Sequence, residues 1–189
     1  MIGLISHHSG GNPLAGGVGY SRKVRDKPFR CLGFDPGLAI TGYGVIERRD
    51  GHTSCVGYGV IRTPQKMPLA ERLQTLHHEA GSIINKYHPL VIGVETLIFA
   101  KNVKTGIVVG EARGVILLAI AQAKIDLVEL TPLQVKQALT TYGRAEKQQV
   151  QYMVKKVLGL KAIPRPDDAA DALAIALAAE QMSALSQWL

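Results

Sequence analysis

The stretch RCLGFDPGLAITGYGVIE, residues 30–47, holds a single internal acid, Asp35, at the end of a short apolar run. Apolar residues occupy alternate positions before this acid, which is the period of a β-strand. Pro36 and Gly37 predict a turn, and a second strand begins at Ile40. We therefore expect a hairpin with the Asp35 carboxylate at its lip. Our working hypothesis is that Asp35 is one ligand of a metal site whose other ligands come from distant parts of the chain.

The remaining elements follow from hydrophobic periodicity and from breaks at Pro and Gly. We expect a turn at 48–51 and a third strand at 54–63, followed by a helix over 69–87, a strand over 90–95, a helix over 105–123, a strand over 125–130, and helices over 131–139, 145–158 and 168–182. A strand meander followed by helix–strand alternation predicts an α/β fold. Its five-stranded mixed sheet is flanked by helices, and the later strands lie parallel to the first.

Glycines inside the predicted elements indicate close packing. Gly42 and Gly44 interrupt the second strand, where a missing side chain favours a bulge or the close approach of another backbone. Gly106, Gly110 and Gly114 recur every fourth residue in one helix, so one of its faces has no side chains. Each such glycine costs a helix about 1 kcal/mol relative to Ala. We expect another element or another protein copy to pack against that face.

The composition is that of one globular domain with a basic excess. The chain has 189 residues and a net charge of +7, which favours a polyanionic partner, although a merely soluble basic protein is the alternative. We expect a disordered extension or an upstream start codon at 1–29, with a basic arm that contacts nucleic acid as the alternative, followed by a domain at 30–182 and a tail at 183–189. Cys31 and Cys55 show no ligand spacing, so the reducing cytoplasm is the expected location. The longest strongly apolar stretch, 114–123, is too short to span a bilayer, and no membrane partner is expected.

Four acids stand apart from the surface charges. Asp35 and Glu95 each end an apolar strand, where a buried carboxylate is costly unless hydrogen bonds or a cation compensate it. Asp171 lies in an almost wholly apolar helix, and Asp168, three residues earlier, faces the same way. For Asp168 and its neighbour Asp167, a role as first-turn helix caps is an equal alternative.

Carboxylates that converge from two strands and a helix suit hard divalent cations. Mg²⁺ and Mn²⁺ prefer oxygen ligands, and a cation removes the repulsion between clustered acids. Two ions about 3.5–4 Å apart can hold the attacking water and the leaving oxygen of a phosphodiester. The basic excess gives a reason for a phosphodiester to bind. The residues alone thus favour a metal-dependent phosphodiesterase.

The chain resembles the RuvC family of bacterial Holliday junction resolvases. The resemblance rests on six segments in the family's order, covering about residues 30–178: GFDPGLAITGYGVI, VETLIFAKN, GEARGV, QVKQAL, AEKQQVQYMV and DDAADALAIA. It implies an RNase H-like fold and a homodimer, with the helical glycines in the dimer contact or in intramolecular packing. It also implies Mg²⁺-dependent, symmetric paired nicks at four-way junction DNA during recombination and repair. The implied partners are the branch-migration proteins RuvA and RuvB.

The resemblance also assigns roles to particular residues. The family's four catalytic and metal-binding acids fall on Asp35, Glu95, Asp168 and Asp171, and its lysines in two of the segments fall on Lys136 and Lys147 as phosphate contacts. The family's base-stacking aromatic aligns with Ile98, so the adjacent Phe99 is a candidate for that role, with burial in the core as the alternative. Lys101 and Lys104 are candidate DNA contacts in the same loop, or are simply solvated. Residues 1–29 have no counterpart in the family.

Two rival functions have specific expectations. An actin-like ATPase or sugar kinase also carries an Asp-Pro-Gly turn after a strand, but that fold repeats within a much longer chain and this chain shows no repeat. A non-catalytic junction-binding protein of the same fold would have lost one of the acids, and all four are present.

Overall fold

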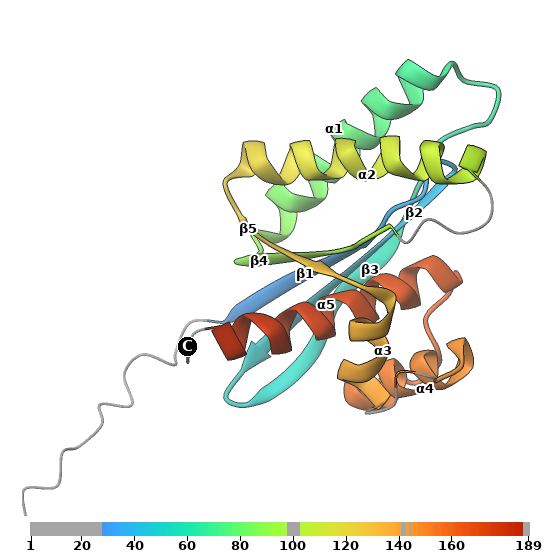
Figure 1. Ribbon diagram of the computed structural model, residues 1–189. Helices are drawn as coiled ribbons and strands as arrows, with labels where there is room; N and C mark the ends of the chain where they lie inside the picture. The colour runs from blue at the N-terminus through green and yellow to red at the C-terminus, as the bar shows by residue number, and fades with distance from the viewer. Residues whose placement is uncertain (1–27, 98–102, 141–142, 144, 187–189) are drawn as a thin grey trace, which may run out of the picture.

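The structure is a computed structural model that describes the backbone of residues 28–97, 103–140, 143 and 145–186, and the side chains of these residues except 103–105 and 184–186. Its elements are β1 (Phe29–Asp35), β2 (Ile40–Arg49), β3 (His52–Arg62), α1 (Leu69–Tyr87), β4 (Val91–Glu95), α2 (Val103–Ala123), β5 (Asp126–Leu130), α3 (Pro132–Thr140), α4 (Lys147–Val157) and α5 (Asp167–Ser186). One five-stranded sheet, in the order β3-β2-β1-β4-β5, separates α1 and α2 on one face from α3, α4 and α5 on the other (Figure 1).

The sheet confirms the predicted topology. β1, β2 and β3 form an antiparallel meander, and β4 and β5 add to the other side of β1 in parallel. The hairpin between β2 and β3 turns at Asp50 and Gly51, which both have positive φ, of 51° and 82°. The predicted elements all exist, with ends that differ by a few residues. The largest difference is in α5, which continues to Ser186, four residues beyond the expected end at Met182.

A row of glycines crosses the middle of the sheet beneath α5. Gly33 of β1 pairs with Gly44 of β2 on one side and with Gly93 of β4 on the other. A Cβ on Gly33 would lie 2.1 Å from the carbonyl oxygen of Ala172 in α5. A Cβ on Gly44 would lie 2.6 Å from a backbone nitrogen of the same helix. The predicted close approach of a backbone at Gly44 is therefore observed, and the partner is the alanine-rich helix α5.

Two hydrophobic cores cover the two faces of the sheet. Leu32, Phe34 and Ile92 point toward α1 and α2, whereas α5 packs on the opposite face with α3 and α4. At the far end of α5, the buried Glu180 carboxylate accepts hydrogen bonds from Arg48 and from Thr53. These contacts fix the C-terminal half of α5 to the β2–β3 hairpin. The helix is thus held along its length, which sets the position of its first turn.

Helix α2 exposes more apolar surface than the sequence indicated. The apolar stretch expected at 114–123 belongs to an 18-residue helical segment, Gly106–Ala123, with a mean hydropathy of 1.6. By length and composition this segment could cross a membrane, so the expectation based on length alone was wrong. Only 22% of it is buried. It also carries two charged residues, Glu111 and Arg113, of which Arg113 is paired with Glu129 within the fold.

Replacing Gly33 by Ala tests the role of the glycine row. The new methyl group would collide with backbone atoms of α5, which cannot rotate away as a side chain can. We expect a loss in the free energy of unfolding at or above the upper end of the ~1–3 kcal/mol typical for overpacking, measured by denaturant titration. The matched control is Gly81→Ala in α1, where nothing lies within 4 Å of the added Cβ. This control should gain up to about 1 kcal/mol. Equal unfolding midpoints for the two variants would contradict the packing argument.

Candidate active site

Asp35 and Glu95 lie at the carboxyl ends of neighbouring parallel strands. β1 and β4 pair in register up to the residue before each acid. Side chains alternate between the faces of a strand. Asp35 therefore shares a face with Gly33, and Glu95 shares it with Gly93, which is the face that α5 covers. Both carboxylates line one pocket of about 190 Å³ between this sheet edge and helices α3, α4 and α5.

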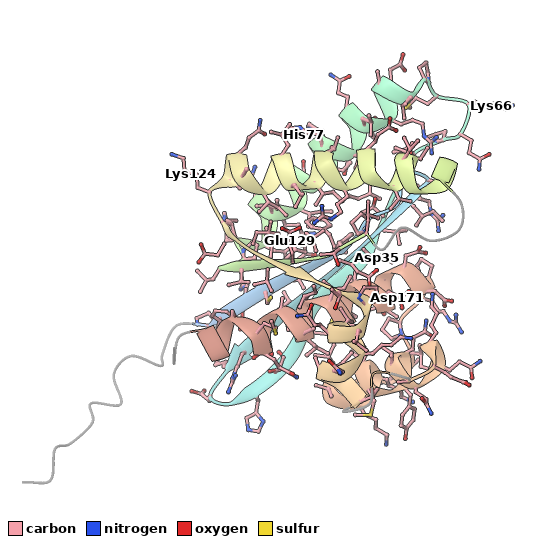
Figure 2. All side chains as sticks on the ribbon, viewed as in Figure 1. Asp35, Lys66, His77, Lys124, Glu129 and Asp171 are labelled. Atoms are coloured by element: carbon pink, nitrogen blue, oxygen red, sulfur yellow. The ribbon has the colours of Figure 1, made fainter. Side chains whose placement is uncertain are left out.

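Asp168 and Asp171 come from the first turns of α5. The Asp168 backbone rests on β2 at Gly42, where a Cβ would lie 2.0 Å from its carbonyl oxygen. Asp171 lines the same pocket as the two strand acids, and Figure 2 shows it close to Asp35 where α5 meets the sheet. Asp168 does not line the pocket, but its charge acts on both Asp35 and Asp171. The four predicted acids are therefore gathered at one end of α5.

Burial and mutual repulsion raise the pKa of three of these carboxyl groups. Loss of hydration, reinforced by the charges of Asp171, Glu95 and Asp168, raises the pKa of Asp35 to about 7. Burial and the charge of Asp171 raise the pKa of Glu95. Burial also raises the pKa of Asp171, although its hydrogen bond with Lys147 acts in the opposite direction. Negative charge in this pocket is thus only partly compensated by the protein.

Two lysines contribute the positive charge of the pocket. Lys147, the first residue of α4, places its Nζ 2.8 Å from Asp171 Oδ2 and 3.7 Å from Asp167 Oδ2. The hydrogen bond to Asp171 raises the pKa of Lys147, so this side chain remains charged. Lys136 lines the pocket from α3, and its charge opposes the rise in the pKa of Glu95. The pocket therefore combines acids on the sheet and α5 with lysines on α3 and α4.

The two helices that carry these lysines each begin with a capping box. At the start of α3, Thr131 Oγ1 accepts a hydrogen bond from the Gln134 N–H, and Gln134 Oε1 accepts one from the Thr131 N–H. The same reciprocal arrangement joins Glu146 and Gln149 at the start of α4. Such capping boxes satisfy N–H groups that have no partner within the helix. Both caps set where their helices enter the pocket.

The turn after Asp35 is closed by its own hydrogen bonds. Thr41 Oγ1 donates to the Gly37 carbonyl oxygen at 2.5 Å and accepts from the Gly37 N–H at 3.3 Å. A Cβ on Gly37 would lie 2.3 Å from the Ile40 carbonyl oxygen, so the tight turn requires glycine there. The Gly37 N–H is thus engaged within the turn. The Pro36–Gly37 pair shapes the hairpin beside Asp35, as the sequence indicated.

The donor set fits a hard divalent cation. Four carboxylates offer only oxygen ligands, which Mg²⁺ and Mn²⁺ prefer. The raised pKa values of Asp35, Glu95 and Asp171 show that a cation would relieve repulsion. Within the described ranges, no three acidic, histidine or cysteine side chains are already arranged around a common point, and the Lys147 ammonium contacts Asp171 instead. An ion would therefore have to draw the carboxylates together and compete with Lys147.

Several predicted contacts lie outside the described part of the chain. They are Ile98, Phe99 and Lys101, together with the side chain of Lys104, whose backbone belongs to α2. The roles assigned to them remain predictions.

One residue that the sequence reasoning missed is Arg113 of α2. Its Nε donates to the main-chain oxygen of Glu95 at 3.1 Å. The signal that could have identified it is a lone arginine in an apolar helix, the same anomaly that drew attention to Asp171 in α5.

Comparison with known proteins gives consistent matches. The family described as "Crossover junction endodeoxyribonuclease RuvC" matches residues 31–179. The protein of that name from Halothermothrix orenii is 56% identical over 146 residues, covering 77% of this chain and 88% of the relative. The Thermus thermophilus RuvC structure superposes with a TM-score of 0.77 at 32% identity, covering 84% of this chain and 97% of that one. T. thermophilus RuvC in complex with Holliday junction substrate gives a TM-score of 0.76 at 31% identity, with coverage of 83% and 96%. The expected RNase H-like fold is confirmed.

Replacing Asp35 by Asn tests the electrostatics of the pocket. A folded-state pKa raised from 3.8 to about 7 stabilises the protein at acidic pH, and this contribution is lost as the pH rises through 7. In EDTA at pH 8, Asp35→Asn should therefore unfold with a higher free energy than the parent, by a few kcal/mol at about 1.4 kcal/mol per pKa unit. The difference should shrink at pH 5.

The control for this experiment is Asp167→Asn. Asp167 lies in the first turn of the same helix, but its side chain is 44% exposed and pairs with Arg165. Its loss should not stabilise the protein at either pH. If Asp35→Asn shows no gain at pH 8, or a larger gain at pH 5, the carboxylates do not repel one another as described.

Proposed function

The chain belongs to the RuvC family of crossover junction endodeoxyribonucleases, and we propose that the cluster of four carboxylates at the start of α5 resolves Holliday junctions by cutting two strands of like polarity at symmetric positions. The observation that carries this proposal is the meeting of Asp35, Glu95 and Asp171 in one pocket that is also lined by Lys136 and Lys147. Hydrolysis of a phosphodiester is accelerated when the negative charge on the phosphoryl group is compensated, and a bound divalent cation and ammonium groups can both do so. The pocket offers oxygen ligands for a cation and ammonium groups for the phosphate.

Asp35, Glu95, Asp168 and Asp171 would hold the divalent metal, with Mg²⁺ as the expected ion, two per subunit, and Mn²⁺ as a substitute. A bound ion supplies Lewis-acid stabilisation of the charge that develops on the phosphoryl oxygens. Asp35 is central because the other three acids all act on its pKa. The hydrogen bonds between Gly37 and Thr41 close the turn that follows Asp35 and so hold its backbone at the site.

Lys136 and Lys147 are the proposed phosphate contacts. Both line the pocket, and the Lys147 side chain is 56% exposed, so its ammonium group can reach a bound strand. In the DNA-bound protein Lys147 would exchange its ion pair with Asp171 for a backbone phosphate. The net charge of +7 favours DNA approach to the whole molecule. Phe99, Lys101 and Lys104 remain proposed DNA contacts on the family resemblance.

The active form is a homodimer joined through α2. Ile107 and Leu118 of α2 are 55% and 52% exposed, and Gly114 lies between them on the same helical face. Nothing in the described chain lies within 4 Å of a Cβ placed on Gly114, so this face is open to the close approach of a second backbone. Gly110 instead faces Leu97 of the same chain. Within the glycine repeat, Gly110 thus packs inside the chain and Gly114 is the proposed dimer contact.

Partners and location follow the family resemblance. The proposed substrate is four-way junction DNA, with RuvA and RuvB as the branch-migration partners, in the cytoplasm. Both cysteines of the chain are free, which fits a reducing compartment. A junction-binding protein without activity is disfavoured because all four acids meet at one end of α5. An actin-like ATPase is disfavoured because the described chain forms one sheet without a repeat.

A cleavage assay on a synthetic four-way junction tests the active site. Asp35→Asn and Asp171→Asn should each lower the rate of Mg²⁺-dependent cleavage by at least about 100-fold, because the loss of a ligand is at least as damaging as the loss of a supporting group. Junction binding, measured by gel shift in Ca²⁺, should be retained. Glu79→Gln, an exposed acid of α1, is the control and should cut normally. Normal cleavage by both pocket variants would overturn the assignment.

Leu118→Glu tests the dimer. A carboxylate at an apolar contact is costly to bury, whereas the exposed position in the single chain should tolerate it. We expect light scattering to show monomers, and junction cleavage to change from paired cuts to slow single nicks. Leu90→Glu is the matched control, since Leu90 is 55% exposed and lies outside α2. A dimeric Leu118→Glu variant with paired cuts would remove α2 from the interface.

A further inference from the structure

Arg113 connects helix α2 to the end of the strand that carries Glu95. Its side chain is only 16% exposed. The Nε donates to the main-chain oxygen of Glu95 at 3.1 Å, and the Nη2 donates to the Glu129 carboxylate on β5. Figure 2 shows Glu129 on the α2 side of the sheet, opposite the face that carries the acids. One guanidinium group therefore joins α2, β4 and β5.

These contacts fix a particular peptide group. The Glu95 carbonyl and the Thr96 N–H belong to the same planar unit. Arg113 binds the oxygen of this unit, and the Thr96 N–H donates to the Leu130 carbonyl oxygen at 2.7 Å. The Thr96 hydroxyl donates to that same Leu130 oxygen at 3.3 Å. The peptide that follows Glu95 is therefore held from both sides, by α2 and by β5.

This restraint acts at the end of the strand, where β1 no longer pairs with β4 and only β5 still pairs with it at Glu95. Glu95 is the last residue of β4, and β1 pairs with β4 only as far as the preceding residue, Val94. At a strand end the backbone can twist, and the side chain moves with it. A catalytic carboxylate has to be held to within about 0.5 Å of its productive position. Without Arg113, the oxygen of Glu95 would lose its one side-chain donor among the described contacts.

We propose that Arg113 is a positioning residue that orients the Glu95 carboxylate toward the metal through the peptide group between Glu95 and Thr96. The guanidinium suits this task because its fork reaches a carbonyl and a carboxylate in fixed directions, whereas a lysine ammonium offers a single mobile point charge. Glu129 compensates the charge of Arg113, so the clamp adds no net charge beside the acids. The proposal rests on the proposed function, since it presumes that Glu95 binds the metal.

The test compares Arg113→Lys with Arg30→Lys. Arg30 is a matched control at the opposite end of the sheet, because its Nε binds the Glu47 carboxylate at 2.7 Å and its Nη1 binds the Tyr87 carbonyl oxygen at 3.0 Å. Mn²⁺ binding to the DNA-free protein, measured by calorimetry, should weaken about 10-fold or more in Arg113→Lys and stay within about twofold in Arg30→Lys. Amide exchange at Thr96 should accelerate in Arg113→Lys while the amides of Ile92 and Val94 stay protected. A merely structural role would instead loosen the whole strand.

A double-mutant cycle with Glu95→Gln completes the test. If Arg113 acts through Glu95, Arg113→Lys should weaken Mn²⁺ binding no further in the Glu95→Gln background. Additive losses, or an Arg113→Lys protein with unchanged Mn²⁺ affinity and unchanged Thr96 exchange, would overturn the positioning role. Asp171→Asn separates the two proposals. If that variant cleaves junctions normally, the active-site assignment fails; if it is inactive while Arg113→Lys binds Mn²⁺ normally, only the role of Arg113 fails.

Discussion

The close contact between α5 and the glycine row is the constraint on which the rest of the structure depends. Gly33 leaves space for the Ala172 carbonyl oxygen, at a position where a Cβ would lie 2.1 Å away. Gly42 leaves space for the backbone of Asp168 in the same way. A helix normally packs on side chains, but here it rests on the backbone of the sheet. The acids at the start of α5 are thereby brought down to the level of the acids at the strand ends.

The same contact brings buried carboxylates close together, and without a bound cation their mutual repulsion destabilises the folded protein. Burial raises the pKa of Asp35 to about 7, and each neighbouring acid adds to the effect. The apolar and alanine-rich packing of α5, together with the Glu180 contacts at its far end, offsets this cost. The proposed function therefore depends on the packing of α5, which holds the mutually repelling carboxylates close together. Acids on a loop could move apart and so reduce their repulsion. These acids are carried instead by two strands and a packed helix.

The sequence predicted the elements and three of the four acids because each carried a local signal, whereas the signal of Asp168 fitted a helix cap equally well and only the family resemblance assigned it. Asp35 and Glu95 close apolar runs, and strand pairing in parallel then places them at one edge. Gly44 signalled a close contact without revealing its partner, because the partner lies more than 120 residues further along the chain. The pairing of Lys147 with Asp171 and the clamp by Arg113 depend on distances between separate elements, which no periodicity encodes. The glycines of α2 predicted a contact on one face of this helix but left its partner open, since an apolar helix has the same sequence pattern whether its faces are buried within the chain or exposed.

Helix α2 carries both the exposed apolar face and the arginine that contacts the end of β4. One side of this helix carries Ile107, Gly114 and Leu118 outward, and Arg113 reaches from it to the backbone of Glu95. The surface proposed to join two subunits and the arginine proposed to position the Glu95 carboxylate thus belong to one helix. In a symmetric dimer, the distance between the two pockets would then be set by helix and sheet rather than by loops. Cuts at symmetric positions in two strands require such a fixed separation, so in the proposed dimer the packing of α2 would serve the geometry of the reaction as well as the assembly.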